Sequence, residues 1–124
     1  MPPPVVVADD SEPILDLIVL TLQRAGIETV TAADGAAALE RIREHSPRVV
    51  ILDAMMPNAD GYEVCRTLRA DDALEQPHVI MLTANAREVD RERAEQAGVS
   101  EFMTKPFSPK LLRERVKELL ESQA

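Results

Sequence analysis

Aliphatic residues gather in five short runs along the chain, and each run predicts a β-strand. The runs span residues 4–8, 28–33, 49–52, 79–83 and 101–104. The first, third and fourth are apolar at successive positions rather than at alternate ones. This pattern is typical of parallel strands that are covered on both faces.

Segments with helical spacing separate these runs and are bounded by residues that begin or end helices. We expect helices to begin at Asp10 or Ser11, Asp34, Gly61, Arg87 and Ser108. The residues expected to face inward are Ile14, Leu17, Ile18, Leu22, Ala38, Leu39, Ile42, Val64, Cys65, Leu68, Val89, Ala94, Ala97, Leu112, Val116, Leu119 and Leu120. Because strands and helices alternate, the pattern predicts an α/β fold with a doubly wound parallel sheet.

The predicted helix at residues 87–97 offers few apolar residues for burial, namely Val89, Ala94 and Ala97. At about 25 cal/mol per Å² of buried apolar area, it should be held less firmly than the last helix. It is either a solvated helix with charge pairs four residues apart or a mobile element suited to switching.

Composition and charge exclude several classes of function. The 124 residues fit one domain, and a formal net charge of -8 argues against nucleic-acid binding, which needs a basic surface. Aromatic residues make up only 2%, which excludes a base-stacking platform. No apolar run approaches the roughly 20 residues that span a bilayer, and the start lacks the features of a signal peptide. With a lone cysteine, Cys65, we expect a cytoplasmic protein that contacts no membrane.

Chemically useful side chains stand at the ends of the predicted strands. Asp9 and Asp10 follow the first strand, Asp53 the third and Lys105 the fifth, while Thr83 ends the fourth. In a five-stranded sheet of order 2-1-3-4-5, strands one and three are neighbours, so the three aspartates converge at the edge where ligands bind. Each residue alone has an ordinary explanation, as a helix cap, a turn former, a strand residue or a solvated charge. Their joint placement favours a site.

Three carboxylates within about 5 Å of one another repel by on the order of 3 kcal/mol per pair at an effective dielectric of about 20. A cation must compensate, and hard carboxylate oxygens at a hydrated site suit Mg²⁺. Three aspartates, one Mg²⁺ and Lys105 sum to about zero charge, so the site can accept a phosphoryl group on Asp53. The Thr83 hydroxyl is then a candidate donor to the phosphoryl oxygens.

Four motifs in a fixed order carry a family resemblance. They are Asp9–Asp10, residues 50–57 followed by Asp60 and Gly61, residues 81–84, and residues 102–107. From Val5 to about Leu120 the sequence resembles the receiver domain of two-component response regulators. The resemblance implies a flavodoxin-like sheet of receiver type flanked by five helices, and a receiver domain over residues 1–124 with no output domain.

The resemblance also implies the parts of the site. Asp53 would be the phosphoacceptor, and Asp10, Asp53 and the backbone carbonyl of Met55 would ligate Mg²⁺, with Asp9 acting through water. Lys105, Thr83 and Ala84 would bind the phosphoryl group, and Phe102 would turn inward as Thr83 moves. Pro57, Gly61 and a cis peptide bond before Pro106 would shape the loops.

Two features are particular to this chain. Phe102 stands at the switch position, where it is either a switching ring without a hydroxyl or simply a core residue. Met55 and Asn85 each lie two residues after a site residue, flanking the path of an attacking water. A bulky apolar Met55 should hinder that water, so we expect slow autodephosphorylation.

The partners implied are a sensor histidine kinase or a phosphotransfer protein as donor, and a downstream protein or an output domain outside this sequence. A small acyl phosphate could also donate the group, and phosphorylation could drive a homodimer. The signalling face would comprise the fourth helix, the fifth strand and the fifth helix. Beyond self-phosphorylation and autodephosphorylation, no enzymatic activity is expected.

Three other functions fit this sequence less well. An FMN or nucleotide carrier would need a Gly-, Ser- or Thr-rich first turn, where this chain has Asp9 and Asp10. An aspartate-nucleophile phosphatase would carry its nucleophile after the first strand, in an Asp-x-Asp arrangement. A receiver-like module that is not controlled by phosphorylation would usually lack one of the acidic or lysine positions.

Overall fold

A five-stranded parallel sheet forms the centre of the computed structural model, which describes residues 3–56, 58, 60–84 and 91–122. The strand order is β2-β1-β3-β4-β5, which confirms the predicted topology. The elements are β1 (Val5–Ala8), α1 (Glu12–Gln23), β2 (Thr29–Ala32), α2 (Gly35–His45), β3 (Val49–Asp53), α3 (Gly61–Arg69), β4 (His78–Thr83), α4 (Arg91–Ala97), β5 (Glu101–Thr104) and α5 (Pro109–Ser122).

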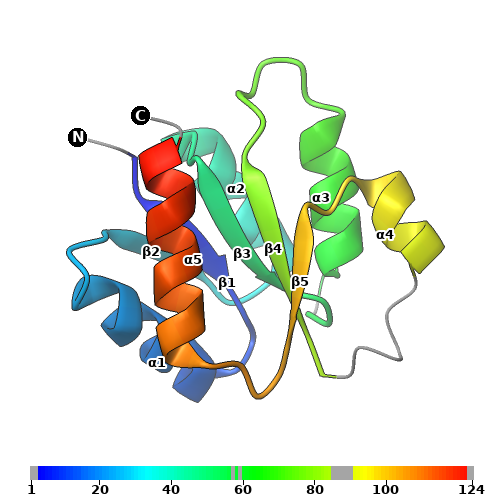
Figure 1. Cartoon of the computed structure of the whole chain (residues 1–124). Helices are drawn as coiled ribbons and strands as arrows, with labels where there is room; N and C mark the ends of the chain where they lie inside the picture. The colour runs from blue at the N-terminus through cyan, green and yellow to red at the C-terminus, as the bar shows by residue number, and fades with distance from the viewer. Residues whose placement is uncertain (1–2, 57, 59, 85–90, 123–124) are drawn as a thin grey trace.

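Helices cover both faces of the sheet, with α1 and α5 on one face and α2, α3 and α4 on the other (Figure 1). Successive residues of β1 alternate between these layers: Val5 and Val7 pack toward α1 and α5, and Val6 and Ala8 toward α2 and α3. This two-sided burial explains why the strand is apolar at every position.

Helix α1 differs from the sequence-based prediction on its buried face. Ile18 and Leu22 are fully buried as expected, but Leu17 is 43% exposed, so its predicted inward position is wrong. Consecutive helical residues are about 100° apart, and the face that meets α5 is centred on Ile18 rather than on Leu17. Of the predicted inward residues, Val89 lies outside the described residues.

Aspartates cap two of the helices. The Asp34 carboxylate accepts from the Ala37 amide at 2.8 Å at the start of α2, as predicted. The Asp60 carboxylate accepts from the Glu63 amide at 2.9 Å at the start of α3. Ser11 holds the N-cap position of α1 but its side chain makes no capping hydrogen bond. The start of α1 is instead tied to the strand before it.

Among the described helices, none combines the length and the apolar character that a membrane crossing requires.

Candidate functional site

The carboxyl ends of β1 and β3 bring three aspartates together. The two strands pair in parallel, with Ala8 beside Leu52, so the residues that follow them meet at one edge. Carboxylate oxygens of Asp9, Asp10 and Asp53 all lie within 4.8 Å of one another. The convergence predicted from the sheet order is therefore present in the structure.

The three carboxylates differ in their exposure to solvent. Asp9 is completely buried and Asp53 is 6% exposed, whereas Asp10 is exposed. One Asp9 oxygen accepts from the Ser11 amide at 2.9 Å, which ties the start of α1 to the site. A hollow of about 350 Å³ opens beside the cluster, lined by Asp10, Asp53, Ala54, Met55, Tyr62, Thr83, Ala84 and Lys105. Ligands therefore reach Asp53 through this hollow.

Lys105 reaches the cluster from the loop after β5. Its Nζ lies 3.0 Å from Asp9 Oδ2 and 3.2 Å from Asp53 Oδ1. The Lys105 amide donates to the Thr83 carbonyl at 2.6 Å, which holds this loop to the end of β4. The peptide bond between Lys105 and Pro106 is cis, as predicted.

Burial and charge perturb the titration of the site. Burial, and then the neighbouring Asp9 carboxylate, raise the pKa of Asp53 to about 6, while Lys105 opposes this rise. Burial lowers the pKa of Lys105, but its contacts with Asp9 and Asp53 outweigh that effect, so the pKa is raised. Lys105 is thus held as a cation between two acids.

The donor set fits a hydrated divalent cation. Among the described residues, Lys105 is the cation that contacts the cluster, so one positive charge faces three carboxylates. Asp9 Oδ2 is buried and lies 3.0 Å from Lys105 Nζ, so this one ammonium is shared between the Asp9 and Asp53 carboxylates. The negative charge that this one cation leaves uncompensated is costly at a partly buried site, and oxygen ligands at an open edge suit Mg²⁺.

Of the remaining predicted residues, Thr83, Ala84 and Met55 line the hollow beside this cluster, and Phe102 does not. Thr83 is buried at the end of β4, and Ala84 is exposed beside it. Phe102 is half-buried and packs against the core cluster on the α2–α4 face. Met55 is 74% exposed at the rim of the hollow. Pro57 and Asn85 lie outside the described residues.

Gly61 lies at a position where there is no space for a side chain. A Cβ atom there would lie 2.5 Å from the carbonyl oxygen of Asp53. The Gly61 amide also donates to the Ala54 carbonyl at 3.1 Å. The start of α3 is therefore packed directly on the end of β3, which explains the glycine.

Sequence reasoning missed Tyr62, a buried residue that lines the hollow. It also missed the contact that Arg93 makes with the Tyr62 ring, 4.8 Å from its centroid. The one available signal was that Tyr62 directly follows the Asp60–Gly61 motif.

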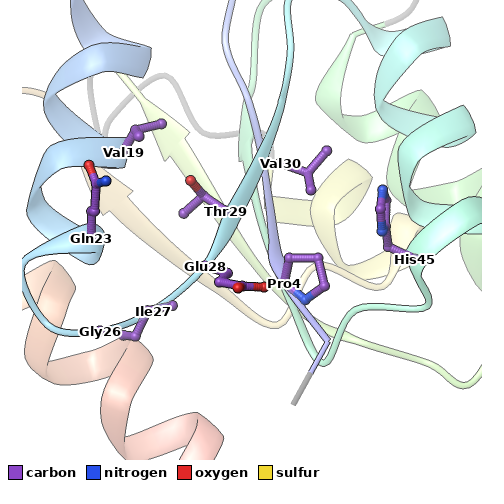
Figure 2. Close-up of a pocket in the computed structure, with 9 residues that line it drawn as sticks. All are labelled: Pro4, Val19, Gln23, Gly26, Ile27, Glu28, Thr29, Val30 and His45. Atoms are coloured by element: carbon purple, nitrogen blue, oxygen red, sulfur yellow. The ribbon is translucent and has the colours of Figure 1, made fainter. Parts of the chain in front are cut away.

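A second hollow, of about 680 Å³, lies around edge strand β2 near its amino end. Its lining side chains come from α1 on one side of the strand and from α2 on the other (Figure 2). It is lined by Pro4, Val19, Gln23, Gly26, Ile27, Glu28, Thr29, Val30 and His45, and includes none of the predicted site residues. The aspartates of the candidate site therefore lie elsewhere, at the carboxyl ends of β1 and β3.

Comparison with known proteins decides the family. The profile of the response regulator receiver domain matches residues 5–117. This chain belongs to the response regulator receiver domain family. Receiver domains are signalling phosphoacceptors that bind Mg²⁺ at an acidic pocket and interact with histidine kinases or phosphotransfer proteins.

Relatives in sequence and structure agree with this assignment. The alkaline phosphatase synthesis transcriptional regulatory protein PhoP of Bacillus subtilis is 39% identical over 116 residues, covering 94% of this chain. This receiver chain spans about half of that relative's length (48%). The receiver domain of the Francisella response regulator 1452 superposes with a TM-score of 0.87 at 34% identity, covering 98% of this chain and 99% of that one. The BeF3-activated receiver domain of DrrB, from Thermotoga maritima, gives 0.82 at 33% identity and the same coverage.

Proposed function

We propose that this receiver domain is a phosphorylation-dependent switch in which Asp53 accepts the phosphoryl group. One observation carries the proposal: the Asp53 carboxylate lines an open hollow, contacts Lys105 and shares a cluster with two further acids. Asp9 is completely buried, with one oxygen held by the Ser11 amide, and in the described part of the chain Lys105 pairs with Asp9 and Asp53 but not with Asp10. Of the three acids, Asp53 is the one placed to react.

In the transfer, a carboxylate oxygen of Asp53 forms a bond to the phosphorus of the donor. The bond from phosphorus to the imidazole nitrogen of a phosphohistidine, or to the carboxyl oxygen of an acyl phosphate, breaks, and the leaving group keeps the electron pair. The Lys105 ammonium stabilises the negative charge on the phosphoryl oxygens from its position beside Asp53.

Asp10, Asp53 and the backbone carbonyl of Met55 would hold Mg²⁺, with Asp9 acting through a water. When bound, the ion neutralises part of the phosphoryl charge that Asp53 and Lys105 alone leave uncompensated. After transfer, the hydroxyl of Thr83 and the backbone of Ala84 would donate to phosphoryl oxygens, since both residues line the hollow. Phe102 would then turn further inward, changing the α4–β5–α5 face that downstream partners read.

The proposed donor is a sensor histidine kinase or a phosphotransfer protein. An apolar groove of about 340 Å³, lined by Ile14, Leu17, Ala84, Lys105, Pro106 and Phe107, adjoins the site and shares Lys105 with it. A donor protein seated there could hold its phosphohistidine over Asp53. By analogy with the longer relative, an output domain or a separate protein would receive the signal, and a phosphorylation-dependent homodimer in the cytoplasm is part of the proposal.

Treatment with a small acyl phosphate tests this function. The wild type should gain one phosphoryl mass in the presence of Mg²⁺, and the Asp53→Asn variant should gain none. Equal gain by both proteins would remove Asp53 from the proposal. A chain that gains no mass but binds partners would favour the module that is not controlled by phosphorylation.

A further inference from the structure

Arg93 of α4 makes two contacts with the start of α3. Its Nη2 lies 2.7 Å from Asp60 Oδ2, and its guanidinium carbon lies 4.8 Å from the centroid of the Tyr62 ring. The other Asp60 oxygen, Oδ1, caps α3 through the Glu63 amide. The two oxygens of one carboxylate therefore join α4 to α3, which lie side by side in Figure 1.

The start of α3 is in turn rigidly connected to the phosphoacceptor. Gly61 packs on the carbonyl oxygen of Asp53, where a Cβ atom would not fit, and donates to the Ala54 carbonyl. Tyr62 lines the same hollow as Asp53. Tyr62, which Arg93 contacts, is therefore a lining residue of the hollow that a ligand of Asp53 would enter.

Helix α4 buries little apolar surface, and Arg69 of α3 holds its carboxyl end by donating to the Gly98 carbonyl at 3.0 Å. Among its described side chains, only Ala94 and Ala97 are buried, and both are small. Because hydrophobic stabilisation follows the apolar area buried, polar contacts carry more of the docking of α4 than of α5. The contacts of Arg93 with Asp60 and Tyr62 therefore stabilise the amino-terminal part of α4 against α3.

We propose that Arg93 is a positioning residue of the switch: its contacts with Asp60 and Tyr62 hold α4 against α3 in the unphosphorylated protein and oppose loading of the acidic site. The inference rests on the proposed function and adds a regulatory contact to it. Tyr62 and Asp53 line the same hollow, so in this switch a phosphoryl group on Asp53 displaces Tyr62 and weakens its contact with Arg93. Coupling between two sites is reciprocal. If loading weakens the Arg93 contacts by some factor, then removing these contacts must raise the affinity of the site for its ligand by the same factor.

Tyr62 provides a direct readout of these contacts, because the chain has one tyrosine and no tryptophan. The tyrosine emission of the wild type should change when Mg²⁺ and beryllofluoride are added together. The Arg93→Ala variant should show, before loading, the emission that the wild type reaches only after loading. Its affinity for beryllofluoride in Mg²⁺ should rise at least about fivefold, the lower range of site-to-site coupling.

Further variants separate the switch from a merely structural role. Asp60→Asn keeps an oxygen that can cap α3 but removes the ion pair with Arg93. It should therefore behave like Arg93→Ala. If Arg93→Ala does not fold, Asp60→Asn is used in its place. Arg93→Lys should restore part of the wild-type response. Arg66→Ala, which removes an exposed arginine of α3, should match the wild type.

Two results would overturn the inference: equal emission of the wild type and Arg93→Ala before loading, or equal beryllofluoride affinity. Either can occur while Asp53 still gains its phosphoryl mass, so the proposed function would survive. If Asp53 gains none, the function fails independently, and the emission of the unloaded proteins still measures the contact.

Discussion

The ammonium of Lys105 lies 3.2 Å from the carboxylate of Asp53. Lys105→Met removes it and keeps the backbone hydrogen bond to Thr83, so the domain should still fold, but with lower stability because the buried Asp9 carboxylate loses its cation. The rate of phosphoryl uptake from an acyl phosphate should fall about 100-fold, the usual effect of losing one preorganised group that stabilises developing charge. Mass spectrometry over time measures the rate.

Lys110→Met is the control for this variant, since Lys110 is an exposed lysine of α5. Its uptake rate should equal that of the wild type. Unchanged uptake in Lys105→Met would show that the contact with Asp53 is only structural.

The raised pKa of Asp53 predicts how stability changes with pH. In the folded protein the pKa rises from 3.8 to about 6, so between these values the native state binds more protons than the unfolded state. The metal-free domain therefore loses stability as pH rises through this window. Asp53→Asn removes this cost, so it should stabilise the metal-free domain by about 2–3 kcal/mol above the window and by little below it. Urea unfolding in a chelator at both ends of the window measures the difference, and equal gains at both ends would contradict the prediction.

The stabilisation of the domain by Mg²⁺ should increase with pH, whereas the stability of the metal-free domain decreases. Only ionised carboxylates bind the ion well, so the rise in melting temperature on adding Mg²⁺ should grow as pH increases through about 6. Asp10→Asn should weaken this rise, since Asp10 is the exposed acid of the cluster. A rise that is the same at all pH values, or the same in Asp10→Asn, would exclude the cluster as the binding site.

Gly61→Ala tests the packing of α3 on β3. The added Cβ would meet the Asp53 carbonyl oxygen at 2.5 Å, so the backbone must shift. We expect a loss of about 1–3 kcal/mol in the free energy of unfolding, as for other overpacked sites, together with weaker Mg²⁺ binding. Gly26→Ala, at a position with open space but a positive φ, serves to compare a strained turn far from the site.

Met55 is predicted to slow autodephosphorylation. It lines the hollow through which water must approach Asp53, and its side chain offers that water no strong hydrogen bond. Met55→Asn supplies a polar group there and should shorten the lifetime of the phosphorylated domain several-fold, about the effect of one hydrogen bond. Following the decay of the phosphorylated mass in both proteins decides this; equal or faster decay in the wild type refutes it.

Much of the fold and of the site could be predicted, because in a parallel sheet the residues at the carboxyl ends of neighbouring strands lie at the same end of the sheet. Asp9 and Asp53 end neighbouring strands, so their meeting follows from the sheet order alone. The cap at Asp34 was equally accessible, because it depends on contacts within one turn.

Other features depend on packing that no local pattern encodes. Leu17 and Ile18 are equally apolar in the sequence, and only the contact of α1 with α5 decides which is buried. The contact of Arg93 with Asp60 joins two helices, and neither residue shows periodicity that would pair them. Such long-range polar contacts became visible only in three dimensions.

The most direct test of the central claim is to locate the phosphoryl group. After reaction with an acyl phosphate in Mg²⁺, borohydride reduces an aspartyl phosphate to an alcohol, and peptide mass spectrometry identifies the altered residue. The account predicts reduction at Asp53 alone, and none when Mg²⁺ is chelated. Reduction at Asp9 or Asp10, or at no residue, would contradict it.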